Sequence, residues 1–498
     1  MRPWTACCAT VSPTYAARVC GRLSKPDSDT MNPPRMFLGL CAFAWTLHAA
    51  ADERIDRIEN GLREPVAVRG APARTMRLSD RMRDLHVPGV SIAVIDHGRI
   101  AWSRAYGVAD VRTNRPVTPA TLFQAASISK PVAAVATVKS RIDLDADVNT
   151  RLRGWHVPEN AFTAQHPVTV RALLSHTAGV SDGGLAGYPA TASCPTLPQE
   201  LEKAAITFVP GSRYAYSSLG YGVLQQVLVD TTGRPFDALA RTTVFAPLGM
   251  RDSLFASTLP AALAPRAAKG YALDGTPIAG GWHCYPEQAA AGLWTTAADL
   301  ARFAIALQDR KHAFLGKQQL EMLLTPVRDD YGLGFELGHS GREPAFHHSG
   351  SNAGYKAQLW AYTRTGQGAV ILTNGDNGAT LIAELMGAIA AEYGWEDWRP
   401  IERAAVPANT ALFDRYVGSY AVSNVTLRVE RRGAKLLLAG PPLGPEPVEL
   451  IPSGDADFFV REKDVTLHFD TDADGRVDTL TFVDGRPRPG RRIEPVSR

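Results

Sequence analysis

The spacing of apolar positions in the central part of the chain predicts two strand pairs separated by a helical region. Strand-like runs flanking short turns occur at both ends of this part: Val90–Ile95 with Arg99–Trp102, and Gly354–Tyr362 with Ala369–Leu372. Helical spacing is found between them, in the stretches Ser127–Lys139, Val170–Ser175, Leu219–Thr232 and Ala297–Leu307. This order predicts an α+β domain whose antiparallel sheet is assembled from segments distant in sequence and is flanked by helices.

The pattern changes near residue 400. Residues 398–411 are rich in Pro and in charge. Short alternating runs separated by Gly, Pro, Asn and Asp follow from Tyr416 onwards, with little helical spacing. We therefore predict a boundary near residue 405, with an α+β domain over residues 52–404 and a small all-β, barrel-like domain over residues 405–498.

Within the second domain, Asp470–Gly475 matches the opening of a calcium-binding loop. The position where such a loop carries its bidentate glutamate is Thr481, and no helical spacing flanks the segment. We interpret the segment as the turn of a β-hairpin. No spacing of Cys and His resembles a metal site, so neither a metal nor a cofactor is predicted.

The longest apolar run, Met36–Leu47, lies in a leader that we assign to residues 1–51. Arg35 precedes the run and the small residues Ala49–Ala51 follow it, which is the order of a secretory signal. The run is too short to cross a bilayer. We therefore expect export to the periplasm or the medium, a mature chain that begins near Ala50–Asp52, and no stable membrane anchor.

Two further features bear on the leader. Met31 or Met36 is a natural start, which would make residues 1–30 an over-extended gene prediction; a disordered cytoplasmic tail before a buried segment stays open as the alternative. The formal charge of +3, from 53 Lys and Arg against 50 Asp and Glu, comes from the leader. This balance argues against a nucleic-acid partner and leaves a small-molecule or peptide substrate as the expected partner. The sequence does not indicate an oligomeric state.

Four of the six cysteines lie in the leader, so only Cys194 and Cys284 remain in the expected mature chain. In an oxidising compartment these two can form one disulfide. Because the sequence does not give the distance between their Cα atoms, two free buried thiols remain an equal alternative.

Two serines are candidate nucleophiles. Ser181 lies in Gly179–Gly183, which fits the G-x-S-x-G pattern, but that pattern requires a strand before it and a helix after it. Here a helical run precedes the motif and a Gly-rich loop follows it. We therefore do not expect Ser181 to be the nucleophile.

Ser127-Ile-Ser-Lys130 is the stronger candidate. It precedes an Ala- and Val-rich helical run that has Pro131 in its first turn, where a missing N–H costs nothing. Residues three apart share a helix face, so the Lys130 amine can reach the Ser127 hydroxyl. A lysine desolvated in a pocket is neutral enough to take a serine proton, and free N–H groups at the helix start can stabilise an oxyanion. The plain alternative is a helix-capping serine beside a solvated lysine.

Further motifs accompany this one in order along residues 85–395. They are Thr121–Lys130, Leu173-Leu-Ser-His-Thr-Ala-Gly179, Pro210-Gly211, Tyr216-Ser-Ser-Leu-Gly-Tyr221, Pro247-Leu-Gly-Met250, Ala291-Gly-Leu-Trp-Thr-Thr296, Ala345–Ser351 and Leu372-Thr-Asn374. With them the chain resembles the serine β-lactamase and penicillin-binding-protein superfamily, in its class C-like group with esterases, D-aminopeptidases and D,D-peptidases. The resemblance implies an antiparallel sheet flanked by helices plus a helical subdomain. Tyr416–Tyr420 is similar to the opening of a lipocalin-like domain appended to some members.

The resemblance implies roles for the site residues. Ser127 is the acylated nucleophile, Lys130 its proton partner, and Tyr216 the general acid/base. His348-Ser349-Gly350 occupies the place of a Lys-Thr-Gly motif, and the backbone N–H groups of Ser127 and Ser351 form the oxyanion hole. Ser218 stands where the family has an Asn that bonds the substrate or the lysine.

The chain departs from the family pattern at several of these positions. The helix after Ser127 is about one turn shorter than usual and lacks a Gly near its end, which bears on the packing behind Lys130. We choose His348 over the adjacent His347 because Gly350 follows it by two; in a strand only one of the two can face the site. A histidine is half-titrated near pH 6.5, whereas a lysine there is a permanent cation for a substrate carboxylate. This difference favours ester or amide hydrolysis over a dedicated β-lactamase or carboxypeptidase.

Two functions follow from these features. The first is an exported serine hydrolase that acts through a Ser127 acyl-enzyme on a β-lactam, a D-amino peptide or a carboxylic ester. The second is a catalytically silent penicillin-binding-like protein that holds a peptide or cell-wall fragment. The combination of Ser127, Lys130 and Tyr216 favours the hydrolase.

Overall fold

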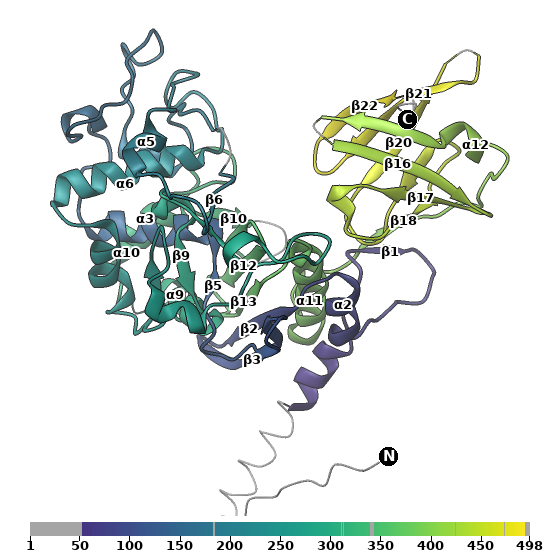
Figure 1. Cartoon of the computed structure of the whole chain (residues 1–498), viewed down its shortest axis with the longest axis horizontal. Coiled ribbons are helices and arrows are strands. Elements are labelled where there is room, and N and C mark those ends of the chain that lie inside the picture. Colours follow the sequence, from purple (N-terminus) through teal and green to yellow (C-terminus); the bar gives the residue numbers. More distant parts are fainter. Residues whose placement is uncertain are drawn as a thin grey trace, which may run out of the picture. The chain divides into compact units, whose positions relative to one another are not determined.

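The computed structural model describes residues 52–493, apart from residues 183, 184, 310, 312, 339–342, 424 and 473 (Figure 1). The predicted secretory leader therefore lies outside the described residues. The described chain begins with a helix over residues 52–59. No helix among the described residues is both long enough and apolar enough to cross a membrane.

A seven-stranded antiparallel sheet organises the α+β domain, in the order β10-β11-β12-β13-β2-β3-β4. The strands are β2 (Gly89–Asp96), β3 (Arg99–Asp110), β4 (Arg115–Pro116), β10 (Glu336–Gly338), β11 (Ala345–Asn352), β12 (Tyr355–Tyr362) and β13 (Gly368–Thr373). The two predicted strand pairs are present, and β13 joins them by pairing with β2 from Gly368↔Ile95 to Thr373↔Val90. The expected α+β architecture is confirmed.

Both faces of the sheet are covered. On β2, Val90, Ile92 and Val94 pack with α11 (Gly378–Tyr393) and α2 (Leu78–Asp84), whereas Ala93 and Ile95 belong to the other core with α9 (Ala297–Gln308). Figure 1 shows the sheet between these helices. Because successive side chains of a strand point to opposite faces, a strand buried on both faces is apolar nearly throughout.

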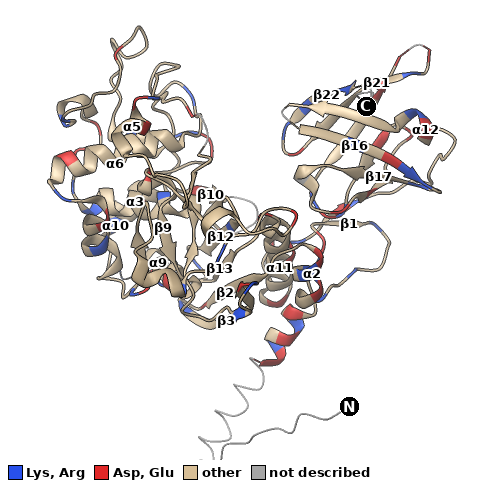
Figure 2. Cartoon of the chain, in the orientation of Figure 1, with Lys and Arg blue, Asp and Glu red and all other residues tan. Residues whose placement is uncertain are grey.

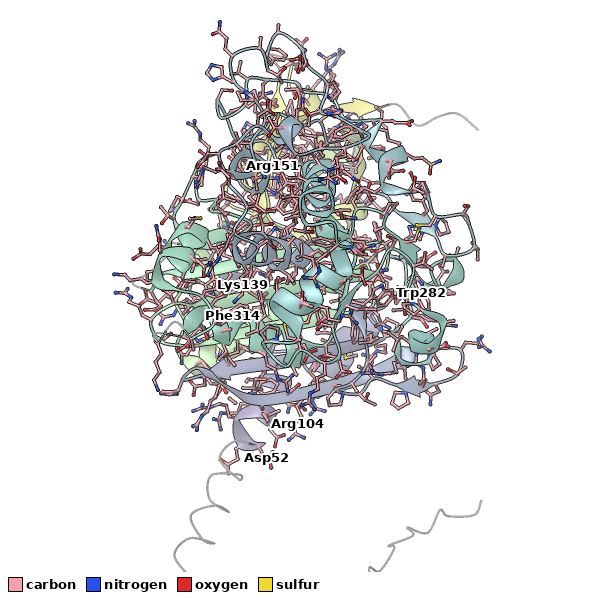
Figure 3. All side chains as sticks on the ribbon, turned by 90° about the vertical axis from the view of Figure 1, so that its left-hand side faces the viewer. Asp52, Arg104, Lys139, Arg151, Trp282 and Phe314 are labelled. Carbon is pink, nitrogen blue, oxygen red and sulfur yellow. A yellow bond between two sulfur atoms is a disulfide. The ribbon has the colours of Figure 1, made fainter. Side chains whose placement is uncertain are left out.

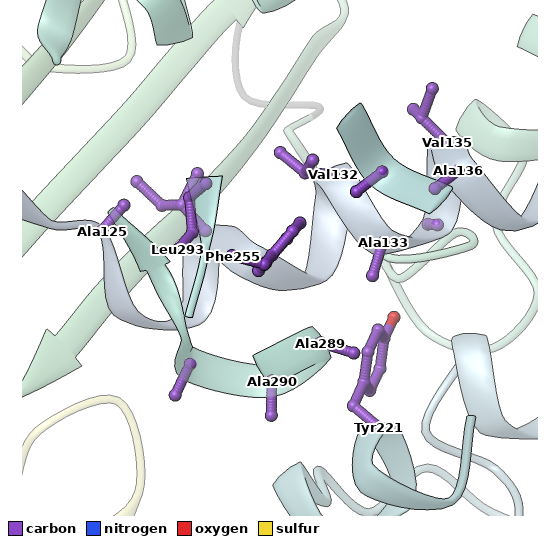
Figure 4. Packing of buried hydrophobic residues seen from close by; sticks show 14 of the residues in the cluster. Ala125, Val132, Ala133, Val135, Ala136, Tyr221, Phe255, Ala289, Ala290 and Leu293 are labelled. Carbon is purple, nitrogen blue, oxygen red and sulfur yellow. The ribbon is translucent and has the colours of Figure 1, made fainter. Parts of the chain in front are cut away.

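The helical subdomain is built around α3 (Ser129–Lys139), α4 (Val170–Leu174), α6 (Ser218–Thr232) and the short α8 (Gln288–Ala291). Ala133 of α3, Ala289 of α8 and Tyr221 of α6 lie where these helices meet (Figure 4). Small side chains allow the helices to approach closely there. Figure 2 shows α6 almost without charge, as its burial requires.

The end of α3 is anchored although the helix is short. Lys139 Nζ donates a hydrogen bond to the Phe314 carbonyl at 2.9 Å and lies 4.1 Å from the centre of the Phe314 ring; both residues are labelled in Figure 3. A cation at a helix C-terminus complements the helix dipole. Gly334 packs against Ala134, where an added Cβ would lie 2.5 Å from the Ala134 Cβ. The packing behind Lys130 is therefore intact.

The four predicted helices are confirmed as α3, α4, α6 and α9, while others were not predicted. The missed helices include α11, α2, α10 (Lys317–Leu324), α5 (Leu197–Leu201) and α7 (Phe236–Ala240).

The remaining strands of this part are β1 (Val66–Val68), β5 (Phe123–Gln124), β6 (Tyr188–Pro189), β7 (Leu254–Phe255), β8 (His283–Cys284), β9 (Leu293–Thr295) and β14 (Ile401–Arg403). Parallel pairing of β1 with β14 brings the start of the described chain beside the segment that precedes the second domain. The boundary at residue 405 falls just after β14 and stays a prediction.

The C-terminal part is a closed antiparallel barrel of eight strands. Helix α12 (Phe413–Tyr416) precedes them; they are β15 (Gly418–Val422), β16 (Val425–Arg432), β17 (Lys435–Ala439), β18 (Val448–Pro452), β19 (Asp457–Phe459), β20 (Thr466–Thr471), β21 (Val477–Val483) and β22 (Pro487–Ile493). Apolar side chains fill its interior, where the Tyr416 and Phe469 rings stack 4.6 Å apart. The barrel confirms the all-β prediction; its lipocalin-like character stays a prediction.

The calcium-like segment is a hairpin turn, as predicted. Strands β20 and β21 pair on either side of it. The Asp472 carboxylate accepts hydrogen bonds from the backbone N–H groups of Asp474 and Arg476 at 2.9 and 2.8 Å. The carboxylate therefore stabilises the turn itself. Among the described residues, no group of three or more His, Cys, Asp or Glu side chains is placed to hold a metal.

Candidate active site

A tight turn presents Ser127. The residue lies in a single 3₁₀ turn, Ala126–Ile128, immediately before α3, and Ala126 adopts φ 50°, in the left-handed region that costs energy for a residue with a Cβ. Strand β11 packs directly against this turn, because a Cβ on Gly350 would lie 2.2 Å from the Ala125 carbonyl oxygen. Only glycine permits this approach. The turn and the strand therefore place Ser127 beside Ser349 and Ser351.

Lys130 lies in the first turn of α3 and is completely buried. Its Nζ is 3.0 Å from the Ser127 Oγ and donates a second hydrogen bond, also of 3.0 Å, to the Ala290 carbonyl. Burial lowers the pKa of the Lys130 amine to about 7, although three carboxylates (Asp182, Glu287 and Glu336) act in the opposite direction. The amine is therefore half-deprotonated near neutral pH and can accept the Ser127 proton.

Tyr216 completes the group around the Ser127 hydroxyl. Its ring centre lies 4.8 Å from Lys130 Nζ, and it lines the same cavity as Ser127 and Ser218. Burial raises the pKa of Tyr216 above its usual value near 10. The phenol is thus protonated at neutral pH, which suits it to deliver a proton rather than to remove one.

His176 is a site residue to which sequence reasoning gave no role. It is buried, its ring centre lies 4.3 Å from that of Tyr216, and its Nδ1 accepts a hydrogen bond of 3.1 Å from the Ser217 N–H. The neutral imidazole therefore supports both Tyr216 and the start of α6. The sequence contained His176 within the motif Ser175-His176-Thr177, but the sequence alone does not show which residues its ring contacts.

His348 is buried between the catalytic group and Tyr331. Its Nδ1 lies 2.6 Å from the Ser349 carbonyl oxygen and its Nε2 lies 3.3 Å from the Tyr331 hydroxyl. Burial, together with the charge of Lys130, lowers the pKa of His348 to about 3. The expectation that this histidine titrates near pH 6.5 is therefore wrong, because it assumed a solvated ring. His347 points elsewhere, stacking on Trp360 at 4.2 Å.

A cavity of about 330 Å³ opens over Ser127. Six of the eight predicted site residues line it (Ser127, Tyr216, Ser218, His348, Ser349 and Ser351), together with Leu185, Ala291, Glu336 and Asn352. Lys130 is buried beside Ser127, and Gly350 forms the strand contact described above. The structure thus brings all eight residues together; their catalytic roles stay predictions. Glu336 was missed.

Ser218, at the position where the resemblance implies an Asn, is the first residue of α6, and the start of this helix is held by other groups. The Ser218 backbone N–H donates a hydrogen bond of 3.1 Å to the Asp182 carboxylate, and the neighbouring Ser217 Oγ accepts one of 2.9 Å from the Gly220 N–H. These bonds satisfy free N–H groups at the start of α6. The start of the helix is therefore held without the amide.

Ser181 lies outside the catalytic cavity. Its Oγ accepts a hydrogen bond of 3.0 Å from the Ala205 N–H, and it lines a separate cavity of about 570 Å³. Val180, immediately before it, forms an isolated bridge with Ile206, and the next described helix, α5, begins only at Leu197. This placement agrees with the choice of Ser127.

Cys194 and Cys284 form a disulfide, with Cα atoms 6.1 Å apart. This resolves the alternative that the sequence left open. The bond supports the pairing of β6 with β8, which joins Tyr188 to Cys284. It thereby fixes the loop that carries Leu185 to the segment leading into Glu287 and Ala290.

Comparison with known proteins agrees with this geometry. The Beta-lactamase family model matches residues 76–391. Penicillin-binding protein 4* of Bacillus subtilis (strain 168) is 24% identical over 446 residues, covering 82% of this chain and 96% of that protein. Esterase EstB of Burkholderia gladioli is 32% identical over 197 residues, covering 36% and 50% of the two chains.

Solved structures show the same fold. The octameric penicillin-binding protein homologue from Pyrococcus abyssi has a TM-score of 0.56 at 20% identity, and the similarity covers 83% of this chain and 98% of that one. The D-amino acid amidase from Ochrobactrum anthropi SV3 has a TM-score of 0.53 at 23% identity, with 64% and 97% covered. Because the family match extends over more than half of the chain, the protein belongs to the β-lactamase family and is a serine hydrolase of the superfamily that includes penicillin-binding proteins and esterases.

Proposed function

We propose that this protein is an exported hydrolase that cleaves an ester or amide through an acyl-enzyme on Ser127. The observation that carries the proposal is the buried Lys130 amine, 3.0 Å from the Ser127 Oγ and with its pKa lowered to about 7. A silent binding protein has no need to bury an amine beside a serine with no carboxylate in direct contact, because such burial costs stability.

In the proposed acylation, the Ser127 Oγ attacks the substrate carbonyl carbon and its proton passes to Lys130 Nζ. The oxyanion accepts hydrogen bonds from the Ser127 and Ser351 backbone N–H groups. Tyr216 then gives its proton to the leaving oxygen or nitrogen as that bond breaks, and the Lys130 ammonium transfers its proton to the resulting phenolate, which restores both groups. Water attacks the acyl-enzyme by the same groups in reverse, which releases the acid and restores Ser127.

The proposed substrate is an ester or amide without a carboxylate next to the scissile bond. The neutral, buried His348 supplies no cation at the position where a lysine would bind a carboxylate. This argument supports esterase or aminopeptidase-like activity over penicillin hydrolysis. Export is supported by the signal-like order of residues 35–51 and by the disulfide, a bond typical of oxidising compartments.

The test combines labelling with turnover. A fluorophosphonate and a fluorescent penicillin are offered to the mature chain, to Ser127→Ala, and to Ser181→Ala as the matched serine control. Hydrolysis of p-nitrophenyl butyrate, D-Ala-p-nitroanilide and nitrocefin is measured in parallel. We expect labelling that only Ser127→Ala abolishes, with ester or anilide cleaved faster than nitrocefin. Absence of both labelling and turnover would leave the silent binding protein as the function.

Export is tested on secreted material. N-terminal sequencing should find a start near Ala50–Asp52. A secreted chain that still contains Met36 contradicts the proposed signal.

A further inference from the structure

The catalytic cavity has one side chain whose charge the proposed mechanism does not use. This side chain is Glu336, the only carboxylate among the described residues that line the cavity. The lining also includes His348, which is neutral. The Lys130 amine is buried outside the lining and is bonded to Ser127 and Ala290. The part of a substrate that enters this cavity therefore meets a carboxylate and no described cation.

The charge of Glu336 is not neutralised by its direct neighbour. Strand β10 places Glu336 opposite His347 of β11, and Glu336 Oε2 lies 3.3 Å from His347 Nδ1. Burial lowers the pKa of His347 to about 4, so the imidazole is uncharged at neutral pH. Burial raises the pKa of Glu336 as well, and the Lys130 amine opposes this shift only while it is protonated; the Glu336 side chain itself is 38% exposed. A carboxyl group therefore faces the cavity, and it carries a negative charge at pH values above its raised pKa.

The neighbouring cavity has the same sign. It shares Leu185 with the catalytic cavity and is lined by Asp182, Glu200 and Glu287 against a single described lysine, Lys203. That lysine is already bound to Glu200 at 2.7 Å. Glu200 and Lys203 therefore offset each other, and burial raises the pKa of Glu287 to about 7, so Asp182 and the ionised fraction of Glu287 give this cavity its excess of negative charge. Charges of the same sign in adjoining cavities reinforce one another, since low-dielectric walls concentrate their field. Both cavities therefore favour a cation over an anion.

We infer that Glu336 makes this active site selective for substrates that carry a positive charge close to the scissile carbonyl, namely esters or amides with an ammonium group. The inference rests on the proposed hydrolase function and adds the charge of its substrate. An ammonium in the cavity gains the attraction of Glu336, whereas a carboxylate is repelled by it and finds no described partner. Glu336 acts on substrate binding and takes no part in the proton transfers.

The test compares three p-nitrophenyl esters that differ in terminal charge. They are the esters of 4-(trimethylammonio)butanoic acid, of its uncharged isostere 5,5-dimethylhexanoic acid, and the monoester of glutaric acid. Assays are run at pH 8 and low salt, and each kcat/KM is divided by the rate of the same ester with hydroxide, which removes differences in intrinsic reactivity. The wild-type chain should favour the cationic ester over the neutral one by about tenfold and disfavour the anionic one by a similar factor, as a partly exposed charge allows.

Glu336→Gln should bring the cationic and neutral esters within about twofold of each other. Glu321→Gln, which removes the same charge from an exposed position on α10, should keep the wild-type preference. In the wild-type chain the preference should also decrease as salt is added, a measurement that does not depend on the variant. If Ser127 is labelled but the wild-type chain hydrolyses the cationic and neutral esters equally well, the inference is wrong and the proposed hydrolase function stands. A preference that survives Glu336→Gln also overturns it. Absence of labelling and of turnover on all three esters refutes the proposed function itself, and the inference with it.

Discussion

The α+β domain and the barrel use their interiors differently. Around Ser127 the first domain buries an amine, two imidazoles and a carboxyl group on Lys130, His176, His348 and Glu287. The barrel interior is filled instead by aromatic and aliphatic side chains, among them the stacked Tyr416 and Phe469. Burying an ionisable group costs stability unless it is paired, so such groups are concentrated where their shifted pKa values serve chemistry. The contrast indicates that the first domain performs the reaction and that the barrel interior contributes mainly stability.

The largest expected effect separates the two serines within the first domain. Ser127→Ala should lower kcat for an activated ester by on the order of 10⁴ or more, because no other hydroxyl can form the acyl-enzyme. Ser181→Ala should remain within a few-fold of the wild-type rate, since its hydroxyl faces the other cavity. Steady-state kinetics on p-nitrophenyl butyrate measures both. Equally deep losses for the two variants would show that the wrong nucleophile was chosen.

The next effect concerns Lys130 and Tyr216 as one proton relay. Lys130→Ala and Tyr216→Phe should each lower kcat by on the order of 10²–10⁴, the range of general acid–base catalysis. The double variant should be little slower than the slower single variant, because groups that act as a unit lose their contribution together. Lys130→Arg should not restore activity, since a guanidinium does not deprotonate in proteins. The measurement is kcat of the four variants on one activated ester at saturating concentration. If the loss in the double variant equals the product of the two single losses, the two residues do not act as a shared relay.

A smaller effect should be visible in the pH dependence. The pKa of Lys130 is about 7, and the neutral amine is the form that accepts the Ser127 proton. The value of kcat/KM should therefore increase about tenfold per pH unit below pH 7 and level off above it. His348 stays neutral over this range, so its titration should not add a step. A profile governed by a group near pH 10 would show that the amine is not desolvated as described.

The smallest effect on activity is expected from the barrel. Phe469→Ala removes a buried ring and should cost about 3–5 kcal/mol of barrel stability. Hydrolysis should stay within about threefold of wild type, because Phe469 belongs to a different core from the residues around Ser127. Thermal unfolding followed together with fluorophosphonate labelling tests both expectations. A parallel loss of labelling would show that the barrel supports the site directly.

The sequence could predict those features that depend on residues close together in the chain, and not those that depend on residues far apart. The strand pairs, α3 and the Ser127–Lys130 spacing depend on residues close in the chain, and local patterns are sufficient for them. Helix α11 was missed because it is apolar on most sides, which hides the helical period. The disulfide stayed open and the role of His176 was unseen because both depend on distances between remote segments. Glu336 lies in a three-residue strand, and only the register of β10 against β11 places it at the cavity.

The pairing of β2 with β13 also has a consequence for how the chain reaches this structure. The two strands meet at Ile95 and Gly368, so the sheet closes only after almost the whole α+β domain has been made. Contacts between such distant segments are slow to form, because the loop between them must be closed first. The sheet of such a chain cannot be complete while the chain is still being synthesised, and a secretory translocon accepts chains that are not fully folded. Late closure of the sheet is therefore compatible with the proposed export.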